Sequence, residues 1–314
     1  MNAQQRSNQR TDWGPDPIEW RRGLALAKRL GGWRLLAVPT GGLRQGPDQQ
    51  DLRDYAPGDD YRQVDWWLAA RRDELLTRCA CRPCDVPVYL LLDCSASMGV
   101  GSPSKWNLLC HIAGQLAWAA IDEQRLVRIT AFGRRKLSNL PSIPARISID
   151  SLVRFLGEVR PEVTSDPKPV GDSATILERF AVRNQHRGVA ILLSDLFDVE
   201  VRAGLASLRR QGYWPVVIQI FAQQEADPAC LGDVELLDVE QGDRCAAVLS
   251  EATLVHYRRG FARFLQHWRR YCLRWNMPCL QFSTASSCLE ILRGLLLRQD
   301  VGGIDGPLDR ERRI

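Results

Sequence analysis

The chain has 314 residues, of which 45% are hydrophobic, enough to build the core of one large domain or two small ones. Its 42 basic and 37 acidic residues give a net charge of +5, a mild excess that requires neither nucleic acid nor an anionic membrane as a partner. The first ten residues lack the apolar core of a secretory signal, and no run approaches the roughly 18 apolar residues of a membrane span. We therefore expect a cytoplasmic protein that does not bind nucleic acid.

The N-terminal region contains two dissimilar segments. Residues 1–17 are polar and contain proline, which predicts a disordered tail. Residues 18–30 have a helical pattern in which apolar and basic side chains are mixed, and four of its side chains are basic: Arg21, Arg22, Lys28 and Arg29. Such a helix could lie on a membrane surface or against a partner, although packing on its own domain is the simpler interpretation.

The ten cysteines are expected to be reduced in a protein without an export signal. Three of them, Cys79, Cys81 and Cys84, form a C-x-C-x-x-C cluster that could supply three zinc ligands. A closed zinc site needs a fourth ligand, and no histidine or paired cysteine motif lies near in sequence. Buried free thiols are therefore favoured over a zinc site.

Residues 88–98 read V-Y-L-L-L-D-C-S-A-S-M, an apolar run that ends in polar side chains. The run predicts a strand buried on both faces, as in the middle of a parallel sheet. Asp93, Ser95 and Ser97 would then lie at the carboxyl end of the strand, where open α/β sheets bind ligands. Their hard oxygen atoms suit Mg²⁺. The alternative is that the two serines cap the next helix.

Residues 51–76 contain a P-G-D-D turn (Pro57 to Asp60), since proline presets one backbone angle, glycine tolerates the positive one and aspartate binds nearby amides. The whole segment and the D-x-S-x-S that follows closely resemble the DUF58 family, whose pattern is R-x-Y-x-P-G-D-D-x-R-x-I-D-W, then A-R, then a strand and D-x-S-x-S-M. The matching residues are Arg53, Tyr55, Pro57, Gly58, Asp59, Asp60, Arg62, Asp65, Trp66, Ala70, Arg71, Asp93, Ser95, Ser97 and Met98.

That resemblance implies an α/β, Rossmann-type von Willebrand factor A-like domain with a doubly wound, mostly parallel sheet and a metal ion-dependent adhesion site. We place this domain at residues 85–298. It would follow a small N-terminal element at residues 18–84 that displays the P-G-D-D turn. Residues 299–314 form a charged tail.

The predicted elements after the first strand alternate as this fold requires. The apolar spacing and turn signals predict helices at 103–121, 148–159, 199–211, 251–275 and 286–298. They predict strands at 126–132, 189–193, 214–221 and 278–283, and a hairpin around Gln241, Gly242 and Asp243.

Two further metal ligands come from the resemblance. In this type of domain a loop threonine joins the metal, and Thr175, placed ahead of I-L-E-R-F, is the best match, with Ser173 as a competing hydroxyl. Asp195 follows the strand at 189–193 and would act through a water, as octahedral Mg²⁺ commonly allows. Asp238 and Glu240, near the hairpin turn, also resemble the family. Their setting favours a structural or partner-contact role over a catalytic pair.

Three kinds of enzyme are disfavoured. The stretch G-V-G-S-P-S-K-W at 99–106 resembles a phosphate loop but lacks its second glycine and its magnesium hydroxyl. A phosphoryl-transfer aspartate at Asp93 would need a second acid two residues later, where Ser95 stands. A serine hydrolase needs a base, and the four histidines, His111, His186, His256 and His267, all fall on predicted helices.

The expected function is therefore binding and not turnover. The chain would be a metal-dependent protein–protein interaction module, with Mg²⁺ or Mn²⁺ held by Asp93, Ser95, Ser97, Thr175 and Asp195 and completed by an acidic residue of a partner. The resemblance implies a MoxR-type AAA+ ATPase as that partner. The alternative is a metal-dependent phosphohydrolase that uses Asp93 and Asp195.

Overall fold

The structure is a computed structural model that describes residues 25, 52–55, 64, 66–72, 75–78, 86–133, 137–139, 149–162, 172–183, 186–286 and 288–297. Several predictions concern residues outside these ranges. They are the tails at 1–17 and 299–314, the basic helix at 18–30 apart from Ala25, the P-G-D-D turn, and the cluster of Cys79, Cys81 and Cys84.

A six-stranded sheet forms the centre of the molecule, in the order β10-β7-β6-β3-β4-β5. Its strands are β3 (Val88–Asp93), β4 (Val127–Phe132), β5 (Leu137–Asn139), β6 (Val189–Ser194), β7 (Trp214–Phe221) and β10 (Cys279–Ser283). All pair in parallel except the edge strand β5, which is antiparallel to β4. The chain runs outward from β3 to β4 and then crosses to β6 on the other side of β3. This order confirms the predicted doubly wound, mostly parallel α/β sheet.

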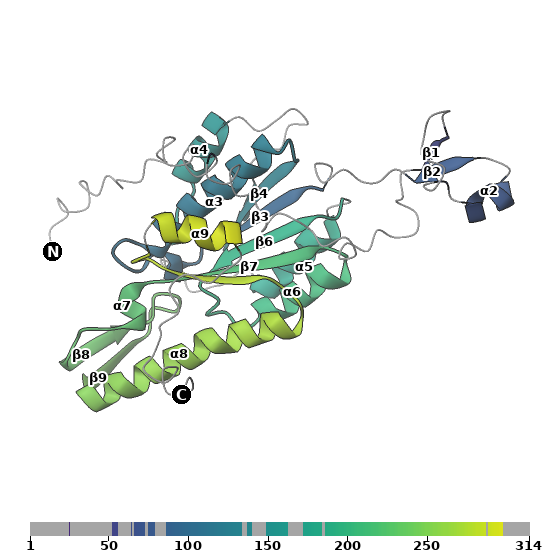
Figure 1. Ribbon diagram of the computed structural model, residues 1–314. Helices are drawn as coiled ribbons and strands as arrows, with labels where there is room; N and C mark the ends of the chain where they lie inside the picture. The colour runs from purple at the N-terminus through teal and green to yellow at the C-terminus, as the bar shows by residue number, and fades with distance from the viewer. Residues whose placement is uncertain are drawn as a thin grey trace, which may run out of the picture.

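Helices cover both faces of the sheet, so the fold has three layers (Figure 1). On one face lie α3 (Lys105–Asp122), α4 (Ile149–Glu158) and α9 (Cys288–Leu297), and on the other lie α5 (Ser173–Arg183), α6 (Val201–Arg210) and α8 (Glu251–Arg274). Alternate residues of β3 supply the two cores: Leu90 and Leu92 face the first set of helices, whereas Tyr89 and Leu91 face the second. Burial on both faces explains why β3 and β6 read as continuous apolar runs.

The predicted helices and long strands are confirmed, each to within two residues at either end. The strand β5 was missed, because three residues are too few to show a period. The apolar spacing in the helix at 251–275 also predicts that Tyr257 and Trp275 face the core, and this prediction is wrong, since Tyr257 is 44% exposed and Trp275 is 46% exposed. A helix of 24 residues is about 36 Å long, and the start of α8 extends past the ends of the strands that it covers, to lie beside β8 and β9 (Figure 1).

Smaller elements complete the described part of the chain. In the segment that carries the family pattern, β1 (Leu52–Asp54) pairs antiparallel with β2 (Leu76–Arg78), and α2 (Trp66–Arg72) lies between them in sequence. After β3 and β7 come the 3-10 helix η4 (Ala96–Gly99) and α7 (Gln223–Ala226).

The predicted hairpin is confirmed as antiparallel β8 (Gly232–Leu237) and β9 (Arg244–Leu249). One predicted helical position is wrong, because His186 lies in the turn before β6. Among the described residues, no helix is long and apolar enough to cross a membrane.

The close approach of two strand starts generates a first prediction. Gly188 lies just before β6 and Pro87 lies just before β3. A Cβ added at Gly188 would clash with the carbonyl oxygen of Pro87 and would lie 2.8 Å from the Cγ of the same proline. We expect Gly188→Ala to lower the free energy of unfolding by about 1–3 kcal/mol, because backbone must move. Gly260→Ala is the matched control: nothing lies within 4 Å of its added Cβ. Removing a helix-interior glycine should stabilise the protein by about 0.5–1 kcal/mol. Equal effects in urea denaturation would contradict the proposed close contact.

Candidate metal site

Asp93 lies at the carboxyl edge of the sheet, where the strand order reverses between β3 and β6. Only 5% of the residue is exposed. Its Oδ1 accepts a hydrogen bond from the backbone N–H of Ser95 at 2.9 Å, and its Oδ2 accepts one from the hydroxyl of Ser194, at the end of β6, at 2.5 Å. These contacts hold the carboxylate in one orientation below the loop that follows β3.

The two serines of the D-x-S-x-S motif bring their hydroxyls together. Ser95 Oγ and Ser97 Oγ are 3.0 Å apart. Adjacent ligands of an octahedral Mg²⁺, each about 2.0–2.1 Å from the ion, lie about 2.9 Å apart, so this separation suits a shared cation. Helix capping does not explain the pair: Ser95 is the N-cap residue of η4, but its side chain makes no capping hydrogen bond, and the hydroxyl that caps α3 belongs to Ser104, which accepts from the N–H of Asn107.

A second buried carboxylate, Asp195, follows β6 and is 3% exposed. Burial, reinforced by the negative charge of Asp195, raises the pKa of Asp93 to about 7, although the hydrogen bonds from Ser194 and Ser95 act in the opposite direction. Because two buried carboxylates repel each other when both are ionised, a cation bound beside them would stabilise their charged forms.

Asp195 already has one cationic neighbour, Lys105, which sequence reasoning missed. Its Nζ lies 2.8 Å from Asp195 Oδ2 and 2.6 Å from Glu225 Oε1, and the lysine is fully buried. The same ammonium lies 4.9 Å from the centre of the Phe197 ring. Burial alone would lower the pKa of Lys105, but the two carboxylates outweigh it and raise that pKa, so the ammonium stays charged.

The helical spacing of α3 was the signal that could have identified this lysine. Lys105 precedes the buried residues Leu109 and Ile112 by four and seven positions, so it lies on the apolar face of the helix. A lysine on such a face must find a buried partner of opposite charge. The resemblance of the surrounding stretch to an imperfect phosphate loop gives no indication of this ion pair.

Buried polar contacts hold Asp195 and Glu225 from the neighbouring strands. Gln219 of β7 donates from Nε2 to the carbonyl of Asp195 at 3.1 Å, and Gln281 of β10 donates to Gln219 Oε1 at 2.8 Å. Glu225, in α7, accepts from the N–H of Ala222 through Oε2 at 2.9 Å. The carboxyl ends of β6, β7 and β10 are therefore linked to one another.

The loop ligand expected from the family resemblance lies in the first turn of α5. The sequence predicts that Thr175 precedes a helix. This is wrong, because α5 begins two residues earlier, at Ser173. The N–H of Thr175 donates to Asp172 Oδ1 at 2.7 Å, and the N–H of Ser173 donates to Asp198 Oδ2 at 3.4 Å. Ser173 is buried and Thr175 is half-buried. Both hydroxyls stay predictions as metal ligands.

One acidic side chain reaches this region from a distant part of the sequence. The N–H of Ser97 donates to Glu240 Oε1 at 2.7 Å. Glu240 belongs to the turn between β8 and β9, for which the sequence predicted a structural or partner-contact role.

The donor set fits a hard divalent cation. Within the described ranges, no group of three or more His, Cys, Asp and Glu side chains is arranged to hold a metal. The site instead combines two hydroxyls with a fixed carboxylate, and Asp195 lies close enough to act on Asp93. Oxygen-only donors of this kind suit Mg²⁺ or Mn²⁺.

Residues 51–267, more than half of the chain, match the model of the family described as "Protein of unknown function DUF58". The chain belongs to the DUF58 family. This DUF58 chain is 24% identical over 207 residues to uncharacterized proteins of Mycobacterium tuberculosis and Mycobacterium bovis. The match covers 64% of this chain, and the chain spans 64% of the length of those relatives.

Solved structures resemble this DUF58 chain only weakly. BatB from Bacteroides thetaiotaomicron is 13% identical, covering 55% of this chain and 85% of its own, with a TM-score of 0.33. An aerotolerance-related membrane protein from Bacteroides fragilis is 14% identical, covering 55% and 87%, with a TM-score of 0.34. Manganese-loaded TRAP from Plasmodium vivax is 18% identical, covering 43% and 57%, with a TM-score of 0.31. Similarity this low carries no function from those proteins to this one.

The buried ion pair generates the second prediction. Lys105→Met should lower the free energy of unfolding by about 3–5 kcal/mol in chelator, because it leaves Asp195 buried without its cation. The control is Arg244→Met, which breaks a 3.4 Å pair with Glu235 in which both side chains are more than 60% exposed. That change should cost no more than about 1 kcal/mol. Urea denaturation measures both, and a similarly small loss in the two variants would contradict the structural role of Lys105.

The third prediction concerns pH. In chelator, folded protein keeps a proton on Asp93 up to about pH 7, whereas the unfolded chain loses it near 3.8. Folded protein therefore binds more protons across this window, so the contribution of Asp93 makes the free energy of unfolding fall as pH rises through it. Asp93→Asn should remove this pH-dependent fall in the free energy of unfolding. Asp233→Asn, which changes an exposed carboxylate of the hairpin, should leave the fall unchanged. Identical pH profiles for wild type and Asp93→Asn would refute this.

Proposed function

We propose that this DUF58 protein is a metal-dependent protein–protein interaction module. One observation carries the proposal: a fixed carboxylate and two hydroxyls 3.0 Å apart lie at the carboxyl end of β3, beside the point of strand reversal. That place is the ligand-binding edge of an open α/β sheet. The doubly wound fold and the family membership support the same conclusion.

Each residue of the site would have a distinct role. The hydroxyls of Ser95 and Ser97 would bind Mg²⁺ directly, and Asp93 and Asp195 would hold it through waters. Thr175 or Ser173 would join when the partner binds. The bound ion would supply a positive charge with one free coordination position, which an acidic side chain of the partner would fill.

The environment of the two aspartates favours binding over turnover. Both oxygens of Asp93 accept hydrogen bonds, and Asp195 is paired with Lys105, so neither carboxylate is placed as a free nucleophile. This disfavours a phosphohydrolase that attacks with one of these carboxylates; the alternative that stays open is a metal-dependent phosphohydrolase in which Asp93 and Asp195 would hold a metal ion that activates water. Metal-dependent release of phosphate from phosphate esters by purified protein, abolished in Asp93→Asn, would favour that alternative.

The proposed partner is a MoxR-type AAA+ ATPase that supplies a Glu or Asp. Support for this step comes from the family resemblance of the D-x-S-x-S and P-G-D-D motifs. We propose a cytoplasmic site for the encounter.

The fourth prediction tests the site with Mn²⁺, which can be followed by electron paramagnetic resonance. Wild type should bind one Mn²⁺ that Mg²⁺ displaces, and Asp93→Asn and Ser95→Ala should each weaken binding at least tenfold. Ser102→Ala is the matched control, since it removes an exposed serine hydroxyl three residues before α3 begins. Its affinity should equal that of wild type. Undiminished Mn²⁺ binding in Asp93→Asn would remove the basis of the proposal.

The same variants test the partner. Capture of the MoxR-type ATPase on immobilised wild type should require Mg²⁺ and be lost in chelator, in Ser95→Ala, in Ser97→Ala and in Asp195→Ala. If Ser95→Ala captured the ATPase as well as wild type does, with chelator present, the metal would not be the bridge between the two proteins.

A further inference from the structure

Glu240 is an acidic side chain that contacts the backbone of the candidate site, and the proposed function requires an acidic group there. Its Oε1 accepts from the N–H of Ser97 at 2.7 Å, although 143 positions separate the two residues. Ser97 is itself one of the two hydroxyl residues of the candidate site. A carboxylate that accepts from a backbone amide makes a charge-assisted hydrogen bond, stronger than a neutral one.

The turn between β8 and β9 is built to present this side chain. Asp238 Oδ1 accepts from the N–H groups of Glu240 at 2.7 Å and Gln241 at 3.2 Å. The backbone closes the turn through Asp238 N–H to Asp243 O and Gly242 N–H to Asp238 O, both 2.8 Å. Gly242 has φ of +81°, a conformation that L residues rarely adopt. The D-x-E-x-G pattern thus specifies a turn with Glu240 at a fixed position.

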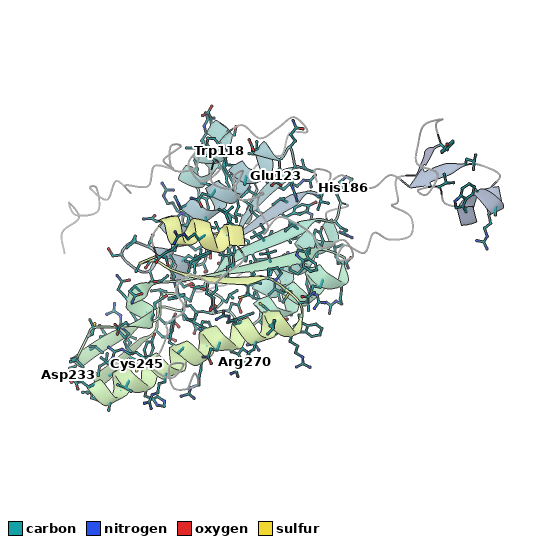
Figure 2. All side chains as sticks on the ribbon, viewed as in Figure 1. Trp118, Glu123, His186, Asp233, Cys245 and Arg270 are labelled. Atoms are coloured by element: carbon teal, nitrogen blue, oxygen red, sulfur yellow. The ribbon has the colours of Figure 1, made fainter. Side chains whose placement is uncertain are left out.

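The hairpin that carries Glu240 lies mostly in solvent. Its strands are largely exposed, with Leu236 50%, Leu237 56% and Val248 72% exposed. Figure 1 shows β8 and β9 beyond α7, beside the start of α8, and Figure 2 labels Asp233 and Cys245 on them. An isolated two-stranded hairpin is marginally stable in water. Because the hairpin strands are mostly exposed, making or breaking the hydrogen bond between Glu240 and Ser97 disturbs little side-chain packing.

We propose that Glu240 is an internal acidic ligand: it occupies the partner's position at the metal site in the free chain, and an acidic partner must displace it. This inference rests on the proposed function and specifies its regulation. A partner carboxylate gains access only when the hairpin tip leaves, so binding a partner and releasing the hairpin are the same event. The exposed hairpin then becomes available as a second contact surface.

The test compares Glu240→Gln with Glu235→Gln, a matched change at an exposed position of the same hairpin. The first measurement is hydrogen exchange in chelator, without any metal. Glu240→Gln should speed exchange at residues 95–99 and 232–249 at least tenfold, because the charge-assisted bond is lost. The second measurement is Mn²⁺ binding by electron paramagnetic resonance with Mn²⁺ as the only added ligand. Glu240→Gln should weaken it about tenfold, and Glu235→Gln should behave as wild type in both.

Both changes are required, so wild-type exchange or wild-type Mn²⁺ affinity in Glu240→Gln overturns the inference. Failure of the underlying function gives a different result. If wild type binds no Mn²⁺, or binds it equally after Asp93→Asn, the metal site itself is wrong. If Asp93→Asn abolishes Mn²⁺ binding and Glu240→Gln does not alter it, the metal site is correct and the proposed role of Glu240 is wrong.

Discussion

The structure depends on how two buried carboxylates are kept at one edge of a sheet. Asp93 ends β3, Asp195 directly follows the neighbouring strand β6, and both are almost fully buried. Burial and the nearby charge of Asp195 raise the pKa of Asp93. Lys105 balances only one of the two carboxylates, through a 2.8 Å contact to Asp195. The hydrogen bonds from Ser194 and the Ser95 amide fix Asp93 but add no positive charge. None of these contacts supplies a cation to Asp93, and the Mg²⁺ of the proposed function would supply one beside the two serine hydroxyls.

Sequence reasoning could predict the sheet and the D-x-S-x-S half of the site because both are local. An apolar run followed by Asp93, Ser95 and Ser97 specifies a strand and the groups at its end, whatever the rest of the chain does. Asp195 follows a strand of the same kind, and the family resemblance supplied the pairing of the two strands. The same local logic predicted the hairpin, since the turn residues and the alternating runs lie within twenty positions of one another.

The contacts that sequence reasoning missed join residues far apart in the chain. Lys105 meets Glu225 across 120 positions, and Ser97 meets Glu240 across 143. Neither contact leaves a periodic signal; only the presence of a lysine on an apolar helix face indicated the first. The exposure of Tyr257 and Trp275 was missed for a related reason, because helical spacing shows which residues share a face and not how far the neighbouring sheet extends.

The two missed contacts divide the site into a permanent part and a part that can change. Lys105 is fully buried and paired with two carboxylates, so removing it would leave charges in the interior, and it must stay in place. Glu240 reaches the site from an exposed hairpin and contacts it through the Ser97 amide, so its proposed departure would uncover no buried charge pair. The proposed exchange of Glu240 for a carboxylate of the partner would then leave the geometry of the candidate site unchanged. That combination suits a module whose task is to bind and release a partner.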